Sequence, residues 1–202
     1  AAQANRSIAA IARWALIAPR LTAWRQTRTD ARTNTGVKGR TPTHDLREIF
    51  NAILYVNRTG IAWRYLPHDF PPHATVYGYF ALWSKEGIFT DLNYQLTGLV
   101  RDHHGRAIEP TASIMDTQSV KTSTNVPADT QGIDAGKKIV GRKRGIITDT
   151  LGLLLAVIVT AASVSDNVIG NDLLDQAATI HPTLTKTWVD AGFKVKTVEH
   201  GA

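Results

Sequence analysis

The spacing of apolar residues changes near residue 108, and this change constrains the fold more than any other feature of the sequence. Before it, apolar side chains recur every three or four residues, as in Leu46, Ile49 and Ile53, which is the period of an amphipathic helix. After it, short apolar and β-branched runs alternate with turn residues, a pattern typical of strands. The sequence therefore predicts a helical region followed by an α/β region, α+β overall.

The helical region contains clear stop signals. Pro19 interrupts a helical apolar pattern, so we expect the first helix to break there, and the polar stretch 29–43 is expected to be a flexible basic loop. Further helices are predicted from Thr43 or His44 to Gly60, over 73–85, and from Ile88 onward. Short helices with basic flanks suit a helix-turn-helix type DNA-binding domain, or a bundle that serves only as a structural platform.

The α/β region predicts strands at 114–120, 145–149 and 153–161, then a helix from Ser165 or Asp166, then a strand at 186–190. The third strand is a continuous apolar run, so we expect it to be buried on both faces. Asp149 opens a tight turn and is interpreted as structural. The predicted order is β-β-β-α-β, and the predicted domains are a basic helical segment and loop (1–40), a helical domain (41–108) and the α/β domain (109–202).

Composition excludes several classes of protein. The 202 residues include no cysteine, which excludes a disulfide framework, a thiolate metal site and a cysteine nucleophile. The longest apolar run, 151–160, is too short for a membrane helix, which needs roughly 20 residues. No secretion leader opens the sequence, so we expect a cytoplasmic protein with no membrane partner.

Positive charge is concentrated in two places. Residues 1–40 carry eight basic side chains and one acidic, and five more cations fall within eight residues between Lys137 and Arg144. Such clusters suit a polyanion such as nucleic acid, or alternatively a solvated surface. The second cluster consists of Lys137, Lys138, Arg142, Lys143 and Arg144.

Two aspartates occupy comparable positions at the strands. Asp116 follows two apolar residues on the first predicted strand, and Asp190 ends the last. The intervening helix permits a crossover that returns the last strand beside the first, so the two carboxylates are expected to face each other. Like charges that close need a cation between them, and oxygen ligands favour Mg²⁺ or Mn²⁺. The alternative is that each aspartate only holds a local turn.

At these residues the sequence resembles the catalytic domain of bacterial insertion-sequence DDE transposases, in particular the family named after insertion sequence five. The upstream helical segments resemble the N-terminal domain of the same family. The matching segments are RWALIAPRL, GRTPTHDLREIFNAILYVNRTGIAWRYLPHDFPP, TVYGYFALWSKEGIF, IMDTQSVKTSTN, GIDAGKKIVGRKRGIITDTLGLLLAVIVTAASVSD and WVDAGF.

The resemblance implies a ribonuclease H-like core and a DNA transposase that cleaves and transfers strands with divalent metal. Asp116 and Asp190 then match the first two acids of the catalytic triad, as catalytic and metal-binding residues. The third acid of the family lies on a later helix that these 202 residues do not contain. We therefore expect an incomplete core and a truncated form, and the alternative function is an inactive remnant that binds element ends without cutting.

The resemblance also implies partners. These are double-stranded DNA at the terminal inverted repeats of the element and further copies of the chain, in the bacterial cytoplasm or at the nucleoid when DNA is bound. The basic cluster is placed to contact DNA phosphates, together with Lys121. Arginines of the N-terminal helices are further candidates for backbone contacts: Arg13, Arg20, Arg25, Arg28 and Arg32.

Overall fold

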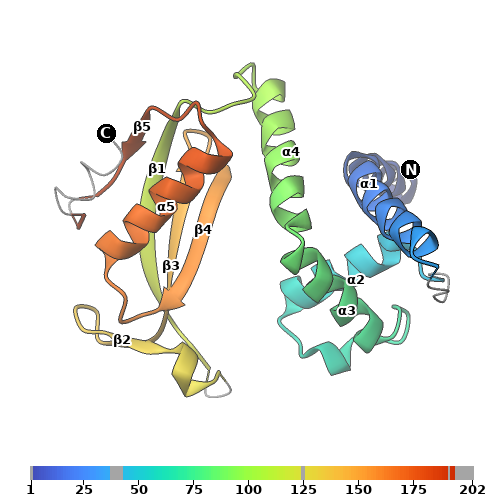
Figure 1. Ribbon diagram of the computed structural model, residues 1–202, viewed down its shortest axis with the longest axis horizontal. Helices are drawn as coiled ribbons and strands as arrows, with labels where there is room; N and C mark the ends of the chain where they lie inside the picture. Colours follow the sequence, from blue (N-terminus) through green and yellow to red (C-terminus); the bar gives the residue numbers. More distant parts are fainter. Residues whose placement is uncertain (1, 37–42, 124–125, 191, 194–202) are drawn as a thin grey trace. The chain divides into compact units, whose positions relative to one another are not determined.

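The computed structural model describes residues 2–36, 43–123, 126–190 and 192–193, and the chain forms two compact units, 1–92 and 93–202 (Figure 1). The first unit is helical, and the second contains the sheet. The helix α4 (Ile88–His103) crosses the boundary between them. Within the described residues, no helix is long and apolar enough to cross a membrane.

The first helix is longer than the sequence predicts. α1 runs from Ala2 to Asn34 with Pro19 inside it, so the predicted break at Pro19 is wrong. Tertiary packing explains the continuity, because Ile17, Leu21 and Trp24 are buried on both sides of the proline while Pro19 itself is exposed. The helix also replaces the first part of the expected loop, and residues 37–42 of that loop lie outside the described residues.

The helix His73–Lys85 lies where the sequence predicts, whereas the helix before it ends at the predicted Gly60 but is capped by Asp45 rather than by Thr43 or His44. α2 (Leu46–Thr59) starts after Asp45, whose carboxylate accepts a hydrogen bond from the Arg47 amide at 2.9 Å. It ends at Gly60, which has φ of 68° and donates its amide to the Val56 carbonyl. After a short 3₁₀ turn, η1 (Trp63–Tyr65), Pro72 precedes α3 (His73–Lys85).

An aromatic cluster forms the core of the helical unit. Trp83 is fully buried and contacts the rings of Trp24, Phe50 and Phe89 at centroid distances of 5.7 to 6.3 Å. Edge-on and tilted packing of this kind adds to the stabilisation from buried area. Of the aromatic side chains of α3, Trp83 is fully buried and Tyr79 and Phe80 are partly buried, whereas Tyr77 is 51% exposed.

The second unit is built around a mixed five-stranded sheet. Its path is β2 (Gly132–Asp134), β3 (Ile139–Asp149), β1 (Ala112–Lys121) and β5 (Lys186–Trp188), and β4 (Leu154–Ala161) also pairs with β3. β1, β2 and β4 are antiparallel to β3, whereas β5 is parallel to β1. The succession β1, β3, β4, α5, β5 is the predicted order, and the short strand β2 is an addition.

The tight turn between β3 and β4 is anchored by an aspartate, as predicted. Asp149 accepts hydrogen bonds from the amides of Leu151 and Leu153 at 2.9 and 2.8 Å. Its carboxylate is fully buried and pairs with Arg101 of α4, whose side chain is 8% exposed. No local pattern in the sequence predicts this buried ion pair, because its two residues are 48 positions apart.

The two faces of the sheet differ in cover. The helix α5 (Asp166–Ile180) packs on one face, with Ile169 and Leu173 against Met115 and Ile147. The approach is close: a side chain at Gly145 would come within 2.4 Å of Ile169. The other face leaves Val157 and Val159 of β4 41% and 57% exposed, so the expectation that this strand is buried on both faces is wrong.

Candidate active site

Asp116 lies on β1, and Asp190 follows the end of the adjacent strand β5, so the predicted strand at 186–190 is two residues too long. The parallel ladder pairs Ala112 with Lys186 and Ile114 with Trp188. Asp116 lies two residues beyond Ile114, and Asp190 lies two residues beyond Trp188, just past the end of the ladder. Because side chains two residues apart share a face of a strand, continuing the register puts Asp116 and Asp190 on the same, exposed side of the sheet.

Each of these carboxylates already holds one local amide. The Thr117 amide donates to Asp116 Oδ1 at 2.7 Å, and the Gly192 amide donates to Asp190 Oδ1 at 2.9 Å. No contact to the Oδ2 atom of either residue is found among the described residues. No third histidine or acid joins them in a cluster able to hold a metal, within the part of the chain that the structure describes.

The second basic cluster is not a loop before the second strand, as expected, but lies mostly inside β3. This strand begins at Ile139, six residues earlier than predicted, and pairs with β2 through a hairpin over 135–138. Lys137 and Lys138 are exposed in this hairpin, and Lys121 is exposed at the end of β1. Strand geometry therefore sends the remaining three cations to alternate faces.

Arg142 and Arg144 lie on the same face as Asp116. Arg144 is paired in register with Gln118, two residues from Asp116, and donates to the Gln118 side chain at 2.9 Å. Arg142 donates to the hydroxyl of Thr130 at 2.8 Å. Neither guanidinium contacts an acidic side chain among the described residues, so no carboxylate offsets their positive charge on this face.

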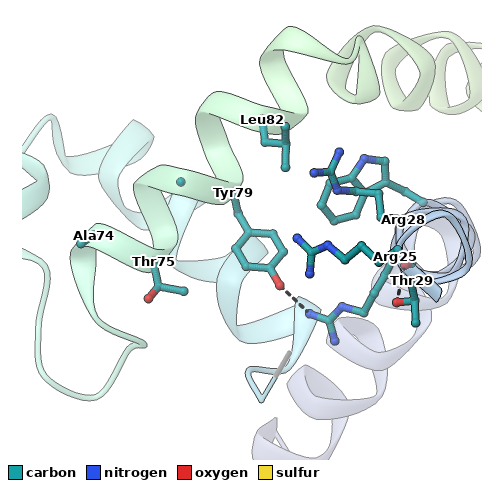
Figure 2. Close-up of a pocket in the computed structure, with 10 residues that line it drawn as sticks. Arg25, Arg28, Thr29, Ala74, Thr75, Tyr79 and Leu82 are labelled. Carbon is teal, nitrogen blue, oxygen red and sulfur yellow. Dashed lines mark hydrogen bonds between the residues drawn. The ribbon is translucent and has the colours of Figure 1, made fainter. Parts of the chain in front are cut away.

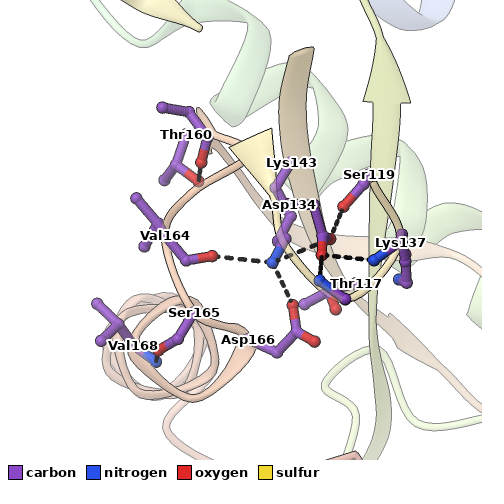
Figure 3. A network of polar contacts seen from close by, with 12 residues as sticks. Thr117, Ser119, Asp134, Lys137, Lys143, Thr160, Val164, Ser165, Asp166 and Val168 are labelled. Atoms are coloured by element: carbon purple, nitrogen blue, oxygen red, sulfur yellow. Dashed lines mark hydrogen bonds and ion pairs between the residues drawn. The ribbon is translucent and has the colours of Figure 1, made fainter. Parts of the chain in front are cut away.

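Lys143 points to the opposite face, where the residue is 4% exposed (Figure 3). It lies 2.9 Å from Asp166 at the start of α5 and 3.4 Å from Asp134 at the end of β2, and donates to the Val164 carbonyl. Lys143 therefore differs from its neighbours: its charge is neutralised inside the protein and is not available to DNA phosphates in this conformation. This burial argues against the predicted contact of Lys143 with DNA phosphates.

Asp134 is the centre of this network and was not singled out from sequence. Its carboxylate accepts from the Ser119 hydroxyl and from the amides of Gly136 and Lys137, the latter two at 3.1 Å. The Ser119 hydroxyl, the Lys137 amide and the ammonium of Lys143 lower its pKa to about 2. The signal available in the sequence was an aspartate two residues before Gly136, a spacing typical of side-chain-capped turns.

A second titratable cluster ties α4 to the end of α5. Glu109 accepts from the Tyr94 hydroxyl and lies 3.2 Å from Nδ1 of His181, which stacks on Tyr94. Hydrogen bonding to Glu109 raises the pKa of Tyr94. Burial raises the pKa of Glu109, but the hydrogen bonds from Tyr94 and His181 lower it below its usual value. This cluster joins segments of the second unit and has a structural role.

The arginines of α1 are largely engaged within the first unit. Arg20 pairs with Asp91, and Arg28 pairs with Glu86 at 2.5 Å. Arg25 donates to the His44 carbonyl at 2.8 Å. Arg13 and Arg32 are exposed. The predicted backbone contacts of these arginines stay a prediction.

Comparison with known families covers most of the chain. Residues 107–201, which include both aspartates, match the family model described as "Transposase DDE domain". Residues 11–93 match the model described as "Putative transposase of IS4/5 family (DUF4096)". No curated protein and no solved structure gives a significant match.

The match of residues 107–201 assigns this part of the chain to the DDE transposases, an enzyme class that acts on DNA. The match of residues 11–93 to a model for IS4/5-family transposases narrows the assignment from DDE transposases in general to those of insertion sequences. The chain belongs to the DDE transposases of insertion sequences, in the group of insertion sequences four and five.

Proposed function

We propose that this transposase carries out metal-dependent DNA strand cleavage and strand transfer, with Asp116 and Asp190 as its catalytic carboxylates. The observation that supports the proposal is the parallel pairing of β5 with β1, because Asp116 and Asp190 each lie two residues beyond its last pair, Ile114 and Trp188. Without a shared ligand, two carboxylates on one face of neighbouring strands repel each other. A ribonuclease H-like core, implied by the family, is consistent with this strand order.

The donor set fits a hard divalent cation. Both aspartates offer oxygen ligands, are solvent-exposed, and use one oxygen for a local amide, so that the position of each carboxylate is fixed before an ion binds. Such ligands favour Mg²⁺ or Mn²⁺. When bound, the metal supplies activation of the attacking oxygen and neutralisation of charge on the phosphate.

Cations near the aspartates hold the DNA. Arg142 and Arg144 share the exposed face with Asp116, and Lys121, Lys137 and Lys138 extend the positive charge along the same end of the strands. Contacts of this kind position the backbone without reading sequence. The DNA partner that we propose is the pair of terminal inverted repeats of the element, bound by more than one copy of the chain.

A second candidate is a DNA-binding form that does not cut. It is favoured by one observation: the described residues contain no third acid or histidine beside the aspartate pair. Such a form would occupy element ends and compete with an active transposase. Both candidates predict DNA binding, and they differ only in cleavage.

A nicking assay separates the two candidates. The chain is incubated with an element-end duplex and Mn²⁺ or Mg²⁺, beside Asp116→Asn and, as a matched control, the exposed Asp129→Asn. We expect cleavage to fall at least about a hundredfold in Asp116→Asn, because a metal ligand that stabilises transition-state charge is lost, and to be unchanged in Asp129→Asn. DNA binding with no nicking by the unmodified chain would support the non-cutting form instead.

A further inference from the structure

A cavity of about 260 Å³ lies between α1 and α3, within the helical unit (Figure 2). Three arginines of α1 line it, and they are spaced at three- and four-residue intervals along one helix face: Arg25, Arg28 and Arg32. The facing wall belongs to α3 and includes Gly78, Tyr79 and Leu82. The cavity is near the lower limit for ligand pockets, so it suits a small group rather than a large organic molecule.

Two of the arginines are held in place by other side chains. Arg28 is fixed by Glu86, which also accepts from the Trp24 indole at 2.5 Å, and its guanidinium lies 5.4 Å from the centre of the Trp24 ring. Arg25 donates through one terminal nitrogen to the His44 carbonyl and, at 3.3 Å, to the Tyr79 hydroxyl (Figure 2). The donors are therefore pre-positioned, which reduces the entropy cost of binding.

The arginines of the cavity have positive charge and a hydrogen-bond donor that an anion could satisfy. Nε of Arg25 is buried and has no acceptor among the described residues. Of the three arginines that line the cavity, only Arg28 pairs with an acidic side chain among the described residues, so Arg25 and Arg32 leave an excess of positive charge. Like charges three or four residues apart on a helix repel each other, and an anion between them removes the repulsion.

The opposite wall leaves room for that anion. A Cβ added at Gly78 would meet no atom within 4 Å, so this helix position faces open space. The Tyr79 hydroxyl adds a polar group, and Leu82 and Trp24 add apolar surface. Guanidinium groups bind phosphate oxygens through directed hydrogen bonds, whereas an apolar wall accepts the sugar next to a phosphate.

We infer that this cavity is a binding site for one phosphodiester group of the DNA backbone, separate from the candidate active site. The inference rests on the proposed function to the extent that DNA is the partner. It assigns part of the DNA affinity to the first unit, through Arg25, Arg28 and Arg32, and to a single phosphate. The contact is sequence-independent, since phosphates carry no base identity.

Two variants test the site by different means. Arg32→Gln removes a charge from an exposed side chain, and Gly78→Leu fills the cavity without changing net charge. Leucine is also a better helix former than glycine, so Gly78→Leu is expected to fold. The matched control for charge is Arg58→Gln, an exposed arginine of α2 outside the cavity.

Binding to a labelled duplex is measured in chelator, at several salt concentrations, in the Asp116→Asn background so that no cleavage occurs. We expect each cavity variant to bind about five- to tenfold more weakly, and the slope of log affinity against log salt to fall by about 0.9, the value for one phosphate contact. Arg58→Gln is expected to match the parent. If both cavity variants also match the parent, the site is not used by DNA.

A second measurement identifies the source of the phosphate. Neutral methylphosphonate groups are placed one at a time along the duplex, and we expect one position that weakens the parent but not Gly78→Leu. The melting temperature in inorganic phosphate is compared with that in chloride at equal ionic strength. Protection by inorganic phosphate with unchanged DNA binding in the variants would overturn the inference. Failure of the nicking assay would leave it standing, because neither measurement here depends on cleavage.

Discussion

Charged residues have different roles on the two faces of the sheet. On the face beneath α5, Lys143 is buried and pairs with Asp134 and Asp166. On the open face, Asp116, Arg142 and Arg144 keep their charges exposed to solvent or partly so. The difference teaches that strand alternation, rather than local composition, decides which residue of a basic run is structural and which is free to bind DNA.

Matched isoleucine substitutions on the two faces should give the largest contrast. Ile147 is fully buried on β3 and Ile114 is 46% exposed on β1. We expect Ile147→Ala to lower the free energy of unfolding by about 3 kcal/mol, through lost burial and the cavity left behind. Ile114→Ala should cost less than about 1 kcal/mol. Denaturant unfolding measures both values, and equal losses would show that the open face is covered in solution.

Replacing Lys143 sharpens the same contrast for charges. Lys143→Met keeps an unbranched side chain of similar size but leaves Asp134 and Asp166 without their cation. We expect the free energy of unfolding to fall by about 2 kcal/mol, which is less than for a fully buried pair because Asp166 is partly exposed. The control Lys137→Met, in the exposed hairpin, should change stability by less than about 0.5 kcal/mol. A stable Lys143→Met with weakened DNA binding would instead return Lys143 to the DNA-binding set.

Neutralising Arg142 and Arg144 on the open face should weaken DNA binding and leave stability unchanged. In the double variant Arg142→Gln, Arg144→Gln we expect DNA affinity to fall about tenfold at moderate salt, with a salt slope lower by up to about 1.8 if each contacts one phosphate. Unfolding free energy should stay within about 0.5 kcal/mol of the parent. Fluorescence anisotropy and denaturant unfolding measure the two effects. An unchanged salt slope would contradict the assignment of these arginines to phosphates.

Low pH should destabilise the face of the sheet that α5 covers, and this is the smallest of the expected effects. The pKa of Asp134 is lowered from 3.8 to about 2 in the folded chain. Its contribution to stability is therefore fully present above about pH 4 and is lost as pH falls towards 2. We expect the melting temperature of Asp134→Asn to change less over this range than that of the parent. Ser119→Ala, which removes the largest cause of the lowered pKa, should shift the loss to higher pH.

Much of the fold follows from local signals in the sequence. Gly60 marks the end of α2, and Asp149 marks the turn before β4, because caps and turns depend mainly on neighbouring residues. The start of α2 was predicted at Thr43 or His44, whereas Asp45 caps the helix. The early start of β3 was missed, since Arg142, Lys143 and Arg144 have the composition of a solvated loop. Their place in a strand depends on pairing with β1 and on carboxylates supplied from elsewhere in the chain.

The candidate site divides in the same way. The apolar residues before Asp116 and Asp190 predict a strand at each aspartate, which is confirmed for Asp116 but not for Asp190, two residues beyond the end of β5. Their relative position depends on how β5 meets β1. The continuity of α1 through Pro19 and the ion pair of Arg101 with Asp149 also depend on tertiary packing. Residues whose partners lie far away in the sequence give little local pattern from which to predict them.

The pairing of β5 with β1 has a consequence for the order of assembly. Ser113 and Thr187, whose hydroxyls meet at 2.8 Å across these strands, are 74 positions apart, whereas β1, β3 and β4 join through nearer neighbours. Closing so long a loop is entropically costly, so the hairpins are expected to form first and the parallel edge last. A divalent cation bound by both aspartates would stabilise only chains in which β5 has paired with β1. Completion of the sheet would then depend on the concentration of that cation.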